Sequence, residues 1–297
     1  MYKIVKKERL ASGIYLMDIE APRVARAALP GQFVIVRIHE KGERIPLTIC
    51  DYSAEQGIVT IVTQVVGASS KMICAKNEGD SLLDFVGPLG QPSEFVNETS
   101  EKLREKKILF IAGGLGTAPV YPQVKWLYEK GISVDVIIGA KNKDLLILQN
   151  EMKAVSKNIY IATDDGSLGF KGLVTGLFDK LVKEGKTYDE VIAVGPMIMM
   201  KFVAAATKPY GIKTTVSLNT LMVDGTGMCG ACRVSVGGKI RFTCVDGPEF
   251  DGHQVDFDEA LRRQSMYREI EKEADCKCLV DKNIHNATSG DEKNAAI

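Results

Sequence analysis

The N-terminal third of the chain alternates short β-branched runs with turn residues. Residues 33–38 and 57–66 are rich in valine, isoleucine and threonine, and residues 81–86 form a third apolar run before a Gly-Pro pair. Runs of this length between turn residues are typical of β-strands. Because several such strands follow one another without a helical pattern, we expect a small antiparallel β-barrel over residues 1–98.

After residue 105 the apolar runs alternate with stretches of helical periodicity. The runs lie at residues 107–112, 132–138, 158–163, 190–194 and 212–217. Strands that alternate with helices form a parallel sheet that is covered on both faces. The pattern therefore predicts an α/β domain over residues 105–218, and the chain as a whole is expected to be a multidomain α+β protein.

The composition is that of an ordinary soluble protein. Of the 297 residues, 45% are hydrophobic and 26% are charged, which is enough apolar material for about two domains. The formal net charge is zero, so nothing points to nucleic acid or to an acidic membrane surface. The N-terminus lacks the apolar run of a signal peptide, and the longest apolar stretch, residues 191–206, is too short and too interrupted to span a bilayer. Seven cysteines in such a chain fit a reducing compartment, and we expect a cytoplasmic protein.

A cysteine motif follows the last predicted strand. Residues 224–232 read Asp-Gly-Thr-Gly-Met-Cys-Gly-Ala-Cys, and eleven residues separate Cys232 from Cys244. Plant-type [2Fe–2S] proteins use the spacing C-x4-C-x2-C with a fourth cysteine further on. Both intervals are kept here, with Asp224 at the first position. The alternative is a structural zinc site, but zinc sites usually pair two C-x2-C motifs and only one is present.

Three glycine-containing loops follow strands of the predicted α/β domain. They are Gly113-Gly-Leu-Gly116, Thr163-Asp-Asp-Gly-Ser167 and Gly195-Pro196. Taken singly, each is explained by a tight turn or a helix start. Together they place backbone N–H groups at the carboxyl ends of strands in one sheet, where nucleotide phosphates bind.

Two motifs in the barrel region suit a second phosphate-bearing ligand. Arg44-Ile-Pro-Leu-Thr48 brings together a planar guanidinium, a rigid proline and a hydroxyl, and arginine binds phosphate bidentately. Gly67-Ala-Ser-Ser-Lys71 opens a predicted helix and offers amides and hydroxyls to a pyrophosphate. The alternatives are an ordinary surface arginine and a simple helix cap.

The remaining thiols and imidazoles form no further motif. The three histidines are scattered and are expected at the surface, without a role as ligand or base. Cys50 and Cys74 are expected to be small core residues. Cys276 and Cys278 could form a redox pair or a second metal element, but no other ligand is near them and they are interpreted as incidental thiols.

In this order the motifs resemble those of the ferredoxin reductase-like electron-transfer flavoproteins. The motifs are Arg-x-Pro-x-Thr, Gly-Gly-Leu-Gly-Thr-Ala-Pro, Thr-Asp-Asp-Gly-Ser, Val-Gly-Pro-Met and the C-terminal cysteines, and they extend over about residues 1–255. The resemblance implies an FAD-binding barrel, an NAD(P)-binding domain and a small [2Fe–2S] domain at residues 219–255. Within the C-terminal segment of residues 256–297, a charged helix is expected over about residues 256–275 and a flexible tail from about residue 281.

Asp224 distinguishes two groups within that family. The dihydroorotate dehydrogenase electron-transfer subunits use four cysteines for the cluster, whereas the small subunits of NADH-dependent ferredoxin:NADP oxidoreductases use one aspartate and three cysteines. The chain resembles the second group, which implies a [2Fe–2S] cluster on Asp224, Cys229, Cys232 and Cys244. Asp246 is the next candidate if the first ligand lies elsewhere.

The resemblance also implies which residues hold the organic cofactors. The residues expected to hold FAD are Arg44, Pro46, Leu47, Thr48, Gly67, Ser69 and Ser70. Those expected to hold NAD(H) are Gly114, Gly116, Thr117, Asp164, Asp165 and Gly195. NADP(H) stays open, because Lys141, Lys143 and Lys171 could attract a 2′-phosphate. Hydride passes between nicotinamide and flavin directly, so no catalytic side chain is expected.

We therefore expect an NAD(P)H:ferredoxin-type flavin oxidoreductase subunit. It would exchange hydride between NAD(H) and FAD and pass single electrons through the cluster. The resemblance implies a heterodimer with a larger flavin and iron–sulfur subunit that reaches ferredoxin and takes part in electron bifurcation. The alternatives are a dihydroorotate dehydrogenase electron-transfer subunit, a free-standing ferredoxin–NADP reductase and a non-enzymatic redox-sensing or metal-binding module.

Overall fold

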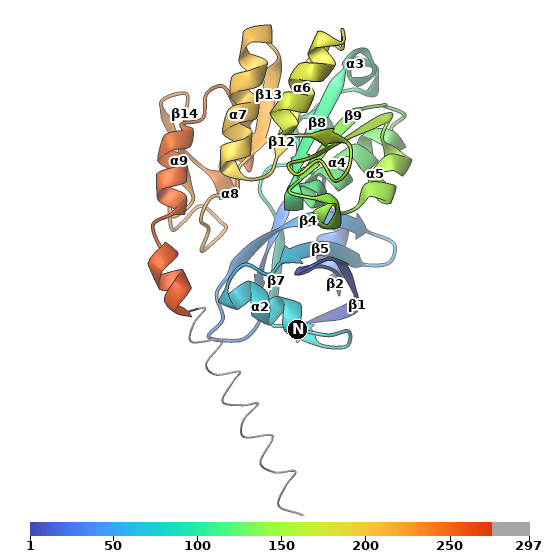
Figure 1. The fold of residues 1–297 in the computed structure, drawn as a ribbon. Coiled ribbons are helices and arrows are strands. Elements are labelled where there is room, and N and C mark those ends of the chain that lie inside the picture. Colours follow the sequence, from blue (N-terminus) through green and yellow to red (C-terminus); the bar gives the residue numbers. More distant parts are fainter. Residues whose placement is uncertain (275–297) are drawn as a thin grey trace, which may run out of the picture.

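The computed structural model describes residues 1–274. Its N-terminal part curls into a barrel, the middle of the chain forms a sheet flanked by helices, and the segment with the cysteines lies along one side of both (Figure 1). The predicted pair of Cys276 and Cys278 and the predicted tail lie outside the described residues. No helix within residues 1–274 is both long enough and apolar enough to cross a bilayer.

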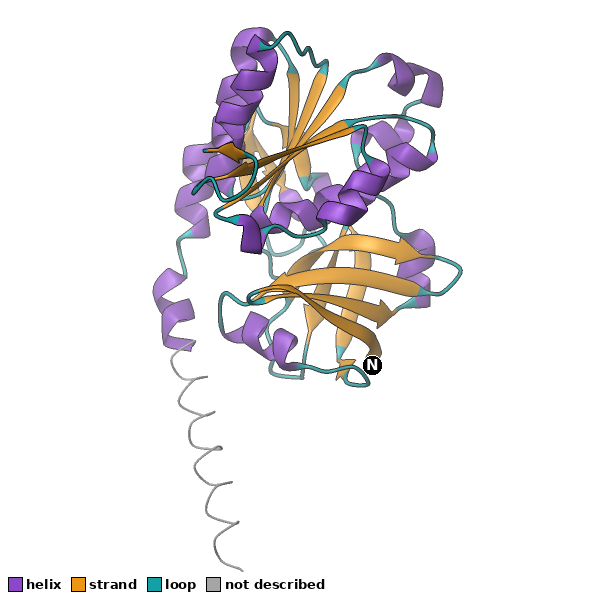
Figure 2. Cartoon of the chain, turned by 45° about the vertical axis from the view of Figure 1, so that its right-hand side comes forward, coloured by secondary structure: helices purple, strands orange, loops and turns teal. Residues whose placement is uncertain are grey.

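The barrel is one strongly curved antiparallel sheet, as Figure 2 shows. Its strands run in the order β6-β1-β2-β5-β4-β3-β7. They are β1 (Tyr2–Ala11), β2 (Ile14–Glu20), β3 (Phe33–Arg37), β4 (Ile45–Ser53), β5 (Ile58–Gln64), β6 (Ser81–Leu82) and β7 (Asp84–Leu89), with helices α1 (Pro22–Ala27) and α2 (Ala68–Ala75) at the ends. Alternate residues such as Val34 and Val36 fill the interior, as the period of two requires. The antiparallel barrel expected from the sequence is confirmed.

The upper sheet is parallel except at one edge. Its order is β11-β10-β9-β8-β12-β13-β16. The strands are β8 (Ile108–Gly113), β9 (Asp135–Ala140), β10 (Asn158–Thr163), β11 (Phe170–Lys171), β12 (Glu190–Val194), β13 (Lys213–Ser217) and the antiparallel β16 (Glu249–Asp251). Leu109 and Ile111 pack into one apolar core and Phe110 and Ala112 into the other. This two-sided burial explains the continuous apolar runs in the sequence.

Helices cover both faces of this sheet, as predicted. The α-helices are α3 (Ser100–Glu105), α4 (Thr117–Glu129), α5 (Gln149–Val155), α6 (Val174–Lys183) and α7 (Met197–Thr207), and the short 3-10 helices are η1 (Glu94–Asn97), η2 (Gly114–Gly116), η3 (Lys143–Leu145) and η4 (Lys208–Tyr210). Helix α4 packs on strand β4 of the barrel, so the two domains meet at the carboxyl edge of the sheet (Figure 1).

The segment with the cysteines returns to the upper sheet. After the hairpin of β14 (Arg233–Val236) and β15 (Lys239–Phe242) and the single turn α8 (Thr243–Asp246), strand β16 pairs with β13. Helix α9 (Phe257–Gln264) follows. The charged helix expected over about residues 256–275 is interrupted rather than continuous. Residues 265–267 form a turn, where the Ser265 hydroxyl donates a 2.8 Å hydrogen bond to the carbonyl oxygen of Arg262, and residues 268–274 are helical again.

Candidate functional site

The loop of residues 223–232 is shaped by glycines. Gly225, Gly227 and Gly230 have φ angles of 83°, 87° and 67°, which side-chain-bearing residues rarely adopt. The loop leaves Cys229 exposed and buries Cys232. Cys244, on the single turn α8, is also buried, and its Sγ lies 3.3 Å from Sγ of Cys232.

The exposed thiol and a thiol of the buried pair differ in the direction of their pKa shifts. Backbone hydrogen bonds from Ala231 and Asp224 lower the pKa of the Cys229 thiol, which favours the thiolate that binds metal. Burial, together with the hydrogen bond to Cys232, raises the pKa of Cys244 to about 12. Buried thiols held this close favour a metal centre, because a coordinated metal deprotonates its thiols.

Asp224 is half-buried, and its carboxylate is turned toward its own loop. Oδ2 accepts hydrogen bonds from the backbone N–H of Thr226 at 2.9 Å and of Met228 at 3.3 Å, and from the Thr226 hydroxyl. The Thr226 hydroxyl and then its amide lower the pKa of Asp224, so the carboxylate is ionised. The alternative ligand, Asp246, is also engaged locally, since Oδ2 accepts a 2.6 Å hydrogen bond from the N–H of Phe242.

The donor set fits a two-iron cluster better than a single ion. Within residues 1–274 no three His, Cys, Asp or Glu side chains gather around one point suited to a metal ion. A [2Fe–2S] centre instead takes two ligands on each iron. Cys232 and Cys244 already form one close pair. Asp224 and Cys229 belong to one loop, from which they would supply the second pair, so the ligand set predicted from the sequence remains compatible with this geometry.

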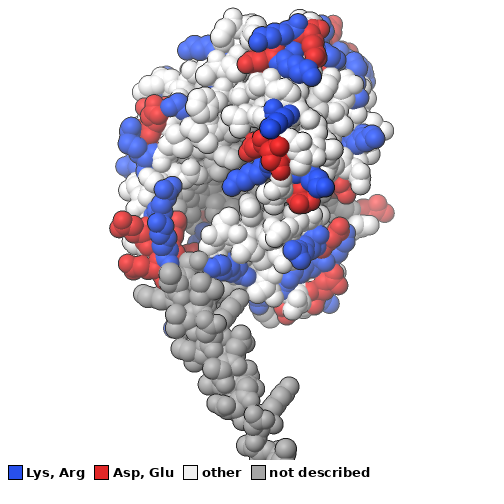
Figure 3. All heavy atoms as spheres, in the orientation of Figure 1, with Lys and Arg blue, Asp and Glu red and all other residues white. Residues whose placement is uncertain are grey.

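The predicted FAD residues lie on β4 and at the start of α2. Pro46, Leu47 and Thr48 are half-buried on β4, where they pair with β3. Gly67 is the N-cap of α2, and a side chain built on it would meet nothing within 4 Å. Figure 3 shows a hollow in this face beside α9, where the barrel meets the upper domain. The open space at Gly67 fits a phosphate-bearing ligand.

Both serines at the start of α2 form hydrogen bonds with other groups of the protein. Ser70 Oγ accepts hydrogen bonds of 2.9 Å from the N–H groups of Val66 and Gly67. The Ser69 hydroxyl donates to the carboxylate of Glu43. These contacts fix the loop and leave its remaining amides to a ligand, whereas the predicted direct contacts of both hydroxyls stay predictions.

Arg44 reaches across to the cysteine loop. Its Nε donates to the carbonyl oxygen of Val223 at 3.1 Å, and Nη2 donates to the carbonyl oxygen of Asp224 at 3.2 Å. Arginine carries five donor hydrogens, so the guanidinium retains capacity for a phosphate. Sequence reasoning assigned Arg44 to the flavin alone and missed this contact, because 179 residues separate the partners.

The glycine loops of the upper sheet converge on two neighbouring strands. Gly116 lies against β12, and a Cβ added there would be 2.1 Å from the carbonyl oxygen of Val194. Gly195 is next to Gly113, with its ideal Cβ 3.2 Å from Cα of that residue. A side chain on Gly114 would meet open space. The strands that carry these loops are adjacent, which places Gly114, Gly116 and Gly195 at one site.

Thr117 and the acidic loop complete this edge. The Thr117 hydroxyl is buried and donates a 3.0 Å hydrogen bond to the carbonyl oxygen of Gly114, so it supports the turn. Asp164 and Asp165 follow β10, two strands away from β8. The Asp165 carboxylate accepts hydrogen bonds from the amide and hydroxyl of Ser167, which lower its pKa. The aspartates thus share the carboxyl edge with the glycines and lie to one side of them.

A buried hydroxyl near the cysteine loop was not among the residues predicted from the sequence. Thr220 Oγ1 is buried and has no hydrogen-bond partner within residues 1–274. It lies between the carboxyl end of β13 and the cysteine loop. A buried unpaired polar atom fits the edge of a site for a polar ligand. A single threonine outside any motif gives no signal that sequence reasoning could have used.

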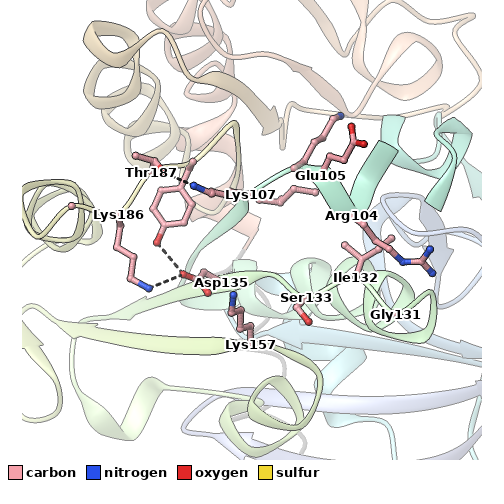
Figure 4. Close-up of a pocket in the computed structure, with 14 residues that line it drawn as sticks. Arg104, Glu105, Lys107, Gly131, Ile132, Ser133, Asp135, Lys157, Lys186 and Thr187 are labelled. Atoms are coloured by element: carbon pink, nitrogen blue, oxygen red, sulfur yellow. Dashed lines mark hydrogen bonds and ion pairs between the residues drawn. The ribbon is translucent and has the colours of Figure 1, made fainter. Parts of the chain in front are cut away.

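A hollow in the described part of the chain lies apart from these sites. About 520 Å³ in volume, it is at the amino ends of the parallel strands, the edge opposite the glycine loops (Figure 4). Asp135 lies at its centre, where Oδ2 accepts a 3.1 Å hydrogen bond from the Tyr188 hydroxyl and is 3.8 Å from Nζ of Lys186. In parallel sheets ligands bind at the carboxyl ends, so this hollow is not the cofactor site.

Comparison with known proteins agrees with this geometry. Residues 219–256 match the family model described as the iron-sulfur cluster binding domain of dihydroorotate dehydrogenase B. A Thermotoga maritima protein described as a homolog of the dihydroorotate dehydrogenase B electron transfer subunit is 49% identical over 270 residues, which cover 91% of this chain and 93% of the relative. The subunit from Desulforamulus reducens is 33% identical, with 85% and 96% covered.

Solved structures give the same result. A chain of the NADH-dependent reduced ferredoxin-NADP oxidoreductase structure superposes with a TM-score of 0.85 at 46% identity, and the match covers 94% of this chain and 98% of that one. Phthalate dioxygenase reductase, at 18% identity and a TM-score of 0.53, shares the fold. The resemblance predicted from the order of the motifs is confirmed, and the chain belongs to the ferredoxin reductase-like family of dihydroorotate dehydrogenase B electron transfer subunits and their homologues.

Proposed function

We propose that this chain is the small, FAD- and [2Fe–2S]-containing subunit of an NADH-dependent ferredoxin:NADP oxidoreductase that bifurcates electrons. The observation that carries the proposal is Asp224 at the first position of the cysteine motif, on a loop that Arg44 joins to the flavin strand. Its 46% identity to a chain of such an enzyme supports this choice. The relatives are electron-transfer subunits, which implies a partner subunit. We propose that this partner is a larger subunit that carries flavin and iron–sulfur clusters.

The residues of the chain bind and orient the cofactors. Gly114, Gly116 and Gly195 offer backbone amides at helix N-termini to the nucleotide phosphates. Arg44 and the loop at Gly67 hold the flavin phosphates from the other side. When bound, FAD takes two electrons as hydride from the nicotinamide and gives them up one at a time. No side chain has to move a proton in hydride transfer, which agrees with the lack of a histidine at these loops.

The cysteine loop is suited to be the exit for single electrons. Cys229 is exposed, and the side chains beside it are apolar and exposed: Met228 is 86% and Val223 is 51% accessible. Exposed apolar side chains around a redox centre are typical of a surface that another protein covers. We assign this surface to the larger subunit, which would pass electrons on to ferredoxin.

The nucleotide is assigned as NAD(H). Asp164 and Asp165 lie at the carboxyl edge, where a ribose is expected, and an ionised carboxylate accepts hydrogen bonds from ribose hydroxyls and repels a 2′-phosphate. Stopped-flow reduction of the flavin should therefore be faster with NADH than with NADPH. Equal or faster reduction by NADPH would reverse the assignment.

The second candidate is the electron-transfer subunit of dihydroorotate dehydrogenase B. The relatives at about one third identity and the match over residues 219–256 favour it. Asp224 in place of the first cysteine speaks against it.

Purification from the native source, followed by native mass spectrometry and electron-transfer assays, tests the choice. We expect a heterodimer with a larger flavin and iron–sulfur subunit that couples NADH, ferredoxin and NADP⁺. Co-purification with a dihydroorotate-oxidising subunit would establish the second candidate. A chain that always emerges alone and reduces ferredoxin unaided would exclude both.

A further inference from the structure

An ion pair joins β4, the strand that carries predicted flavin contacts, to α4, the helix whose N-terminus carries predicted nucleotide contacts. Nζ of Lys125, on α4, lies 2.8 Å from both carboxylate oxygens of Asp51, on β4. The two side chains are about 30% exposed, and 74 residues separate them in the chain. Desolvation opposes the charge on Lys125, but the hydrogen bond and charge of Asp51 outweigh it and raise the pKa of the lysine. The lysine is therefore charged near neutral pH.

A bulge in β4 is what aims Asp51 at the helix. Against β5, Ile49 pairs with Ile61 but Asp51 pairs with Thr60, so the chain carries one extra residue at Cys50. Ile49 and Tyr52 pack toward the barrel interior. In a regular strand Asp51 would share the face of Ile49 and enter that apolar core. The bulge instead turns Cys50 and Asp51 outward together.

The same bulge builds the apolar contact between the domains. Cys50 and Val62 from the barrel pack with Ala118 and Leu148 from the upper domain, and Tyr121 of α4 lies against them. Burial raises the pKa of the Cys50 thiol, so it stays neutral within this contact. Helix α4 packs on β4, and Figure 1 shows the helix on the side of the upper domain that faces the barrel. The ion pair borders this contact and fixes where along the strand the helix lies.

Asp51 and Lys125 each lie on the same rigid element as a predicted cofactor contact. Asp51 is three residues beyond Thr48, about 10 Å along the strand. Lys125 is nine residues beyond Gly116, about 14 Å along the helix. A shift of either element at the ion pair is thus carried to the flavin on one side and to the nucleotide on the other.

We propose that Asp51 and Lys125 are positioning residues that hold the nucleotide-binding end of α4 in register with the flavin strand, and so set the approach of nicotinamide to flavin. The inference rests on the proposed function, since it assumes that both cofactors bind at these elements. Hydride transfer requires reacting atoms about 3–3.5 Å apart, and a displacement of about 1 Å costs up to about 100-fold in rate. Neither residue needs to touch a cofactor for this effect.

The test compares Asp51→Asn and Lys125→Met with a matched control in the holoprotein. The control is Asp84→Asn, which removes the ion pair of Arg37 and Asp84, 2.6 Å apart and also about 30% exposed, but wholly within the barrel. We expect NADH to bind each Asp51 or Lys125 variant within about twofold of wild type. The charge-transfer absorbance of the nicotinamide–flavin complex should fall by at least about half, and the limiting rate of flavin reduction should fall about tenfold. Asp84→Asn should change neither.

Two further measurements keep the outcome decisive. Hydrogen–deuterium exchange at residues 45–53 and 117–129 should speed up in Asp51→Asn and not in Asp84→Asn, whether or not NADH reacts. Asp51→Lys combined with Lys125→Asp should restore part of the charge-transfer absorbance, because the charges again attract. If exchange and absorbance match the control, the positioning role is overturned. If exchange is faster in Asp51→Asn than in Asp84→Asn but NADH does not reduce the flavin of the wild-type protein, the proposed function fails instead.

Discussion

Nη2 of Arg44 lies 3.2 Å from the carbonyl oxygen of Asp224, so a residue of the flavin motif also holds the loop that carries the first predicted cluster ligand. With the second contact, from Nε to Val223, the guanidinium fixes two successive carbonyl groups of that loop. A change at Arg44 should therefore act on both cofactor sites.

We expect Arg44→Ala to release FAD during purification, because the phosphate loses its guanidinium partner. The variant should also broaden the EPR signal of the reduced cluster, since the ligand loop loses two hydrogen bonds worth about 1 kcal/mol each. Flavin and iron are measured per chain, with Arg37→Ala in the barrel as the control. Full retention of FAD would remove Arg44 from the flavin site, and an unchanged EPR signal would show that the loop does not depend on it.

The second prediction concerns Asp224. A carboxylate is a harder donor than a thiolate, so Asp224→Cys should keep the cluster and shift its EPR signal and reduction potential. Asp224→Ala should lower the iron content. Thr226→Val, which removes only a hydroxyl donor to this carboxylate, serves as a milder variant and should shift the potential less. If Asp224→Ala changes neither iron content nor signal, the ligand is Asp246 or another group.

The third prediction separates crowding from backbone strain in the glycine turn. Gly116→Ala should destabilise the protein by about 3 kcal/mol, because its Cβ would be 2.1 Å from a carbonyl oxygen of β12. Gly114→Ala meets open space and only the strain of a φ of 54°, so it should cost about 1 kcal/mol. Urea unfolding of both variants measures the difference. Equal losses would mean that the turn can move away from β12.

The elements of the fold could be predicted because each leaves a local pattern. The apolar run at residues 107–112 ends in glycines, and the structure makes it a strand, β8, followed by a turn and a helix. A strand buried on both faces and a glycine turn are specified by neighbouring residues. The C-terminal helix was predicted as continuous, but residues 265–267 form a turn between two helical stretches, and the charged residues on both sides gave no sign of this break.

The contacts between domains could not be predicted in the same way. Asp51 stands in an ordinary strand, and the bulge that turns it outward depends on the register with β5. The partner of Arg44 is 179 residues away. Such contacts form only when the folded domains pack against each other, and no local sequence pattern indicates them.

The last prediction concerns Glu249, whose carboxylate lies where the three parts of the chain meet. The hydroxyl of the buried Ser93, from the loop after the barrel, donates to it at 2.9 Å, and the buried Gln123 of α4 is beside it. Burial, opposed by the hydrogen bond from Ser93 and aided by the charges of Glu190 and Glu94, raises the pKa of Glu249 to about 7. The carboxyl therefore prefers to stay protonated in the folded state.

The direction of the pH dependence follows from this raised value. Between the ordinary glutamate pKa and pH 7 the unfolded chain loses the proton first, so the folded state binds more protons and stability falls as the pH rises. Glu249→Gln removes this loss. The variant should match wild type near pH 4.5 and be more stable above pH 7, by at most about 3 kcal/mol. Urea unfolding over this range measures it, with the exposed Glu184→Gln as the control. A constant difference between Glu249→Gln and wild type at all pH values would show that the carboxyl titrates as it does in the unfolded chain.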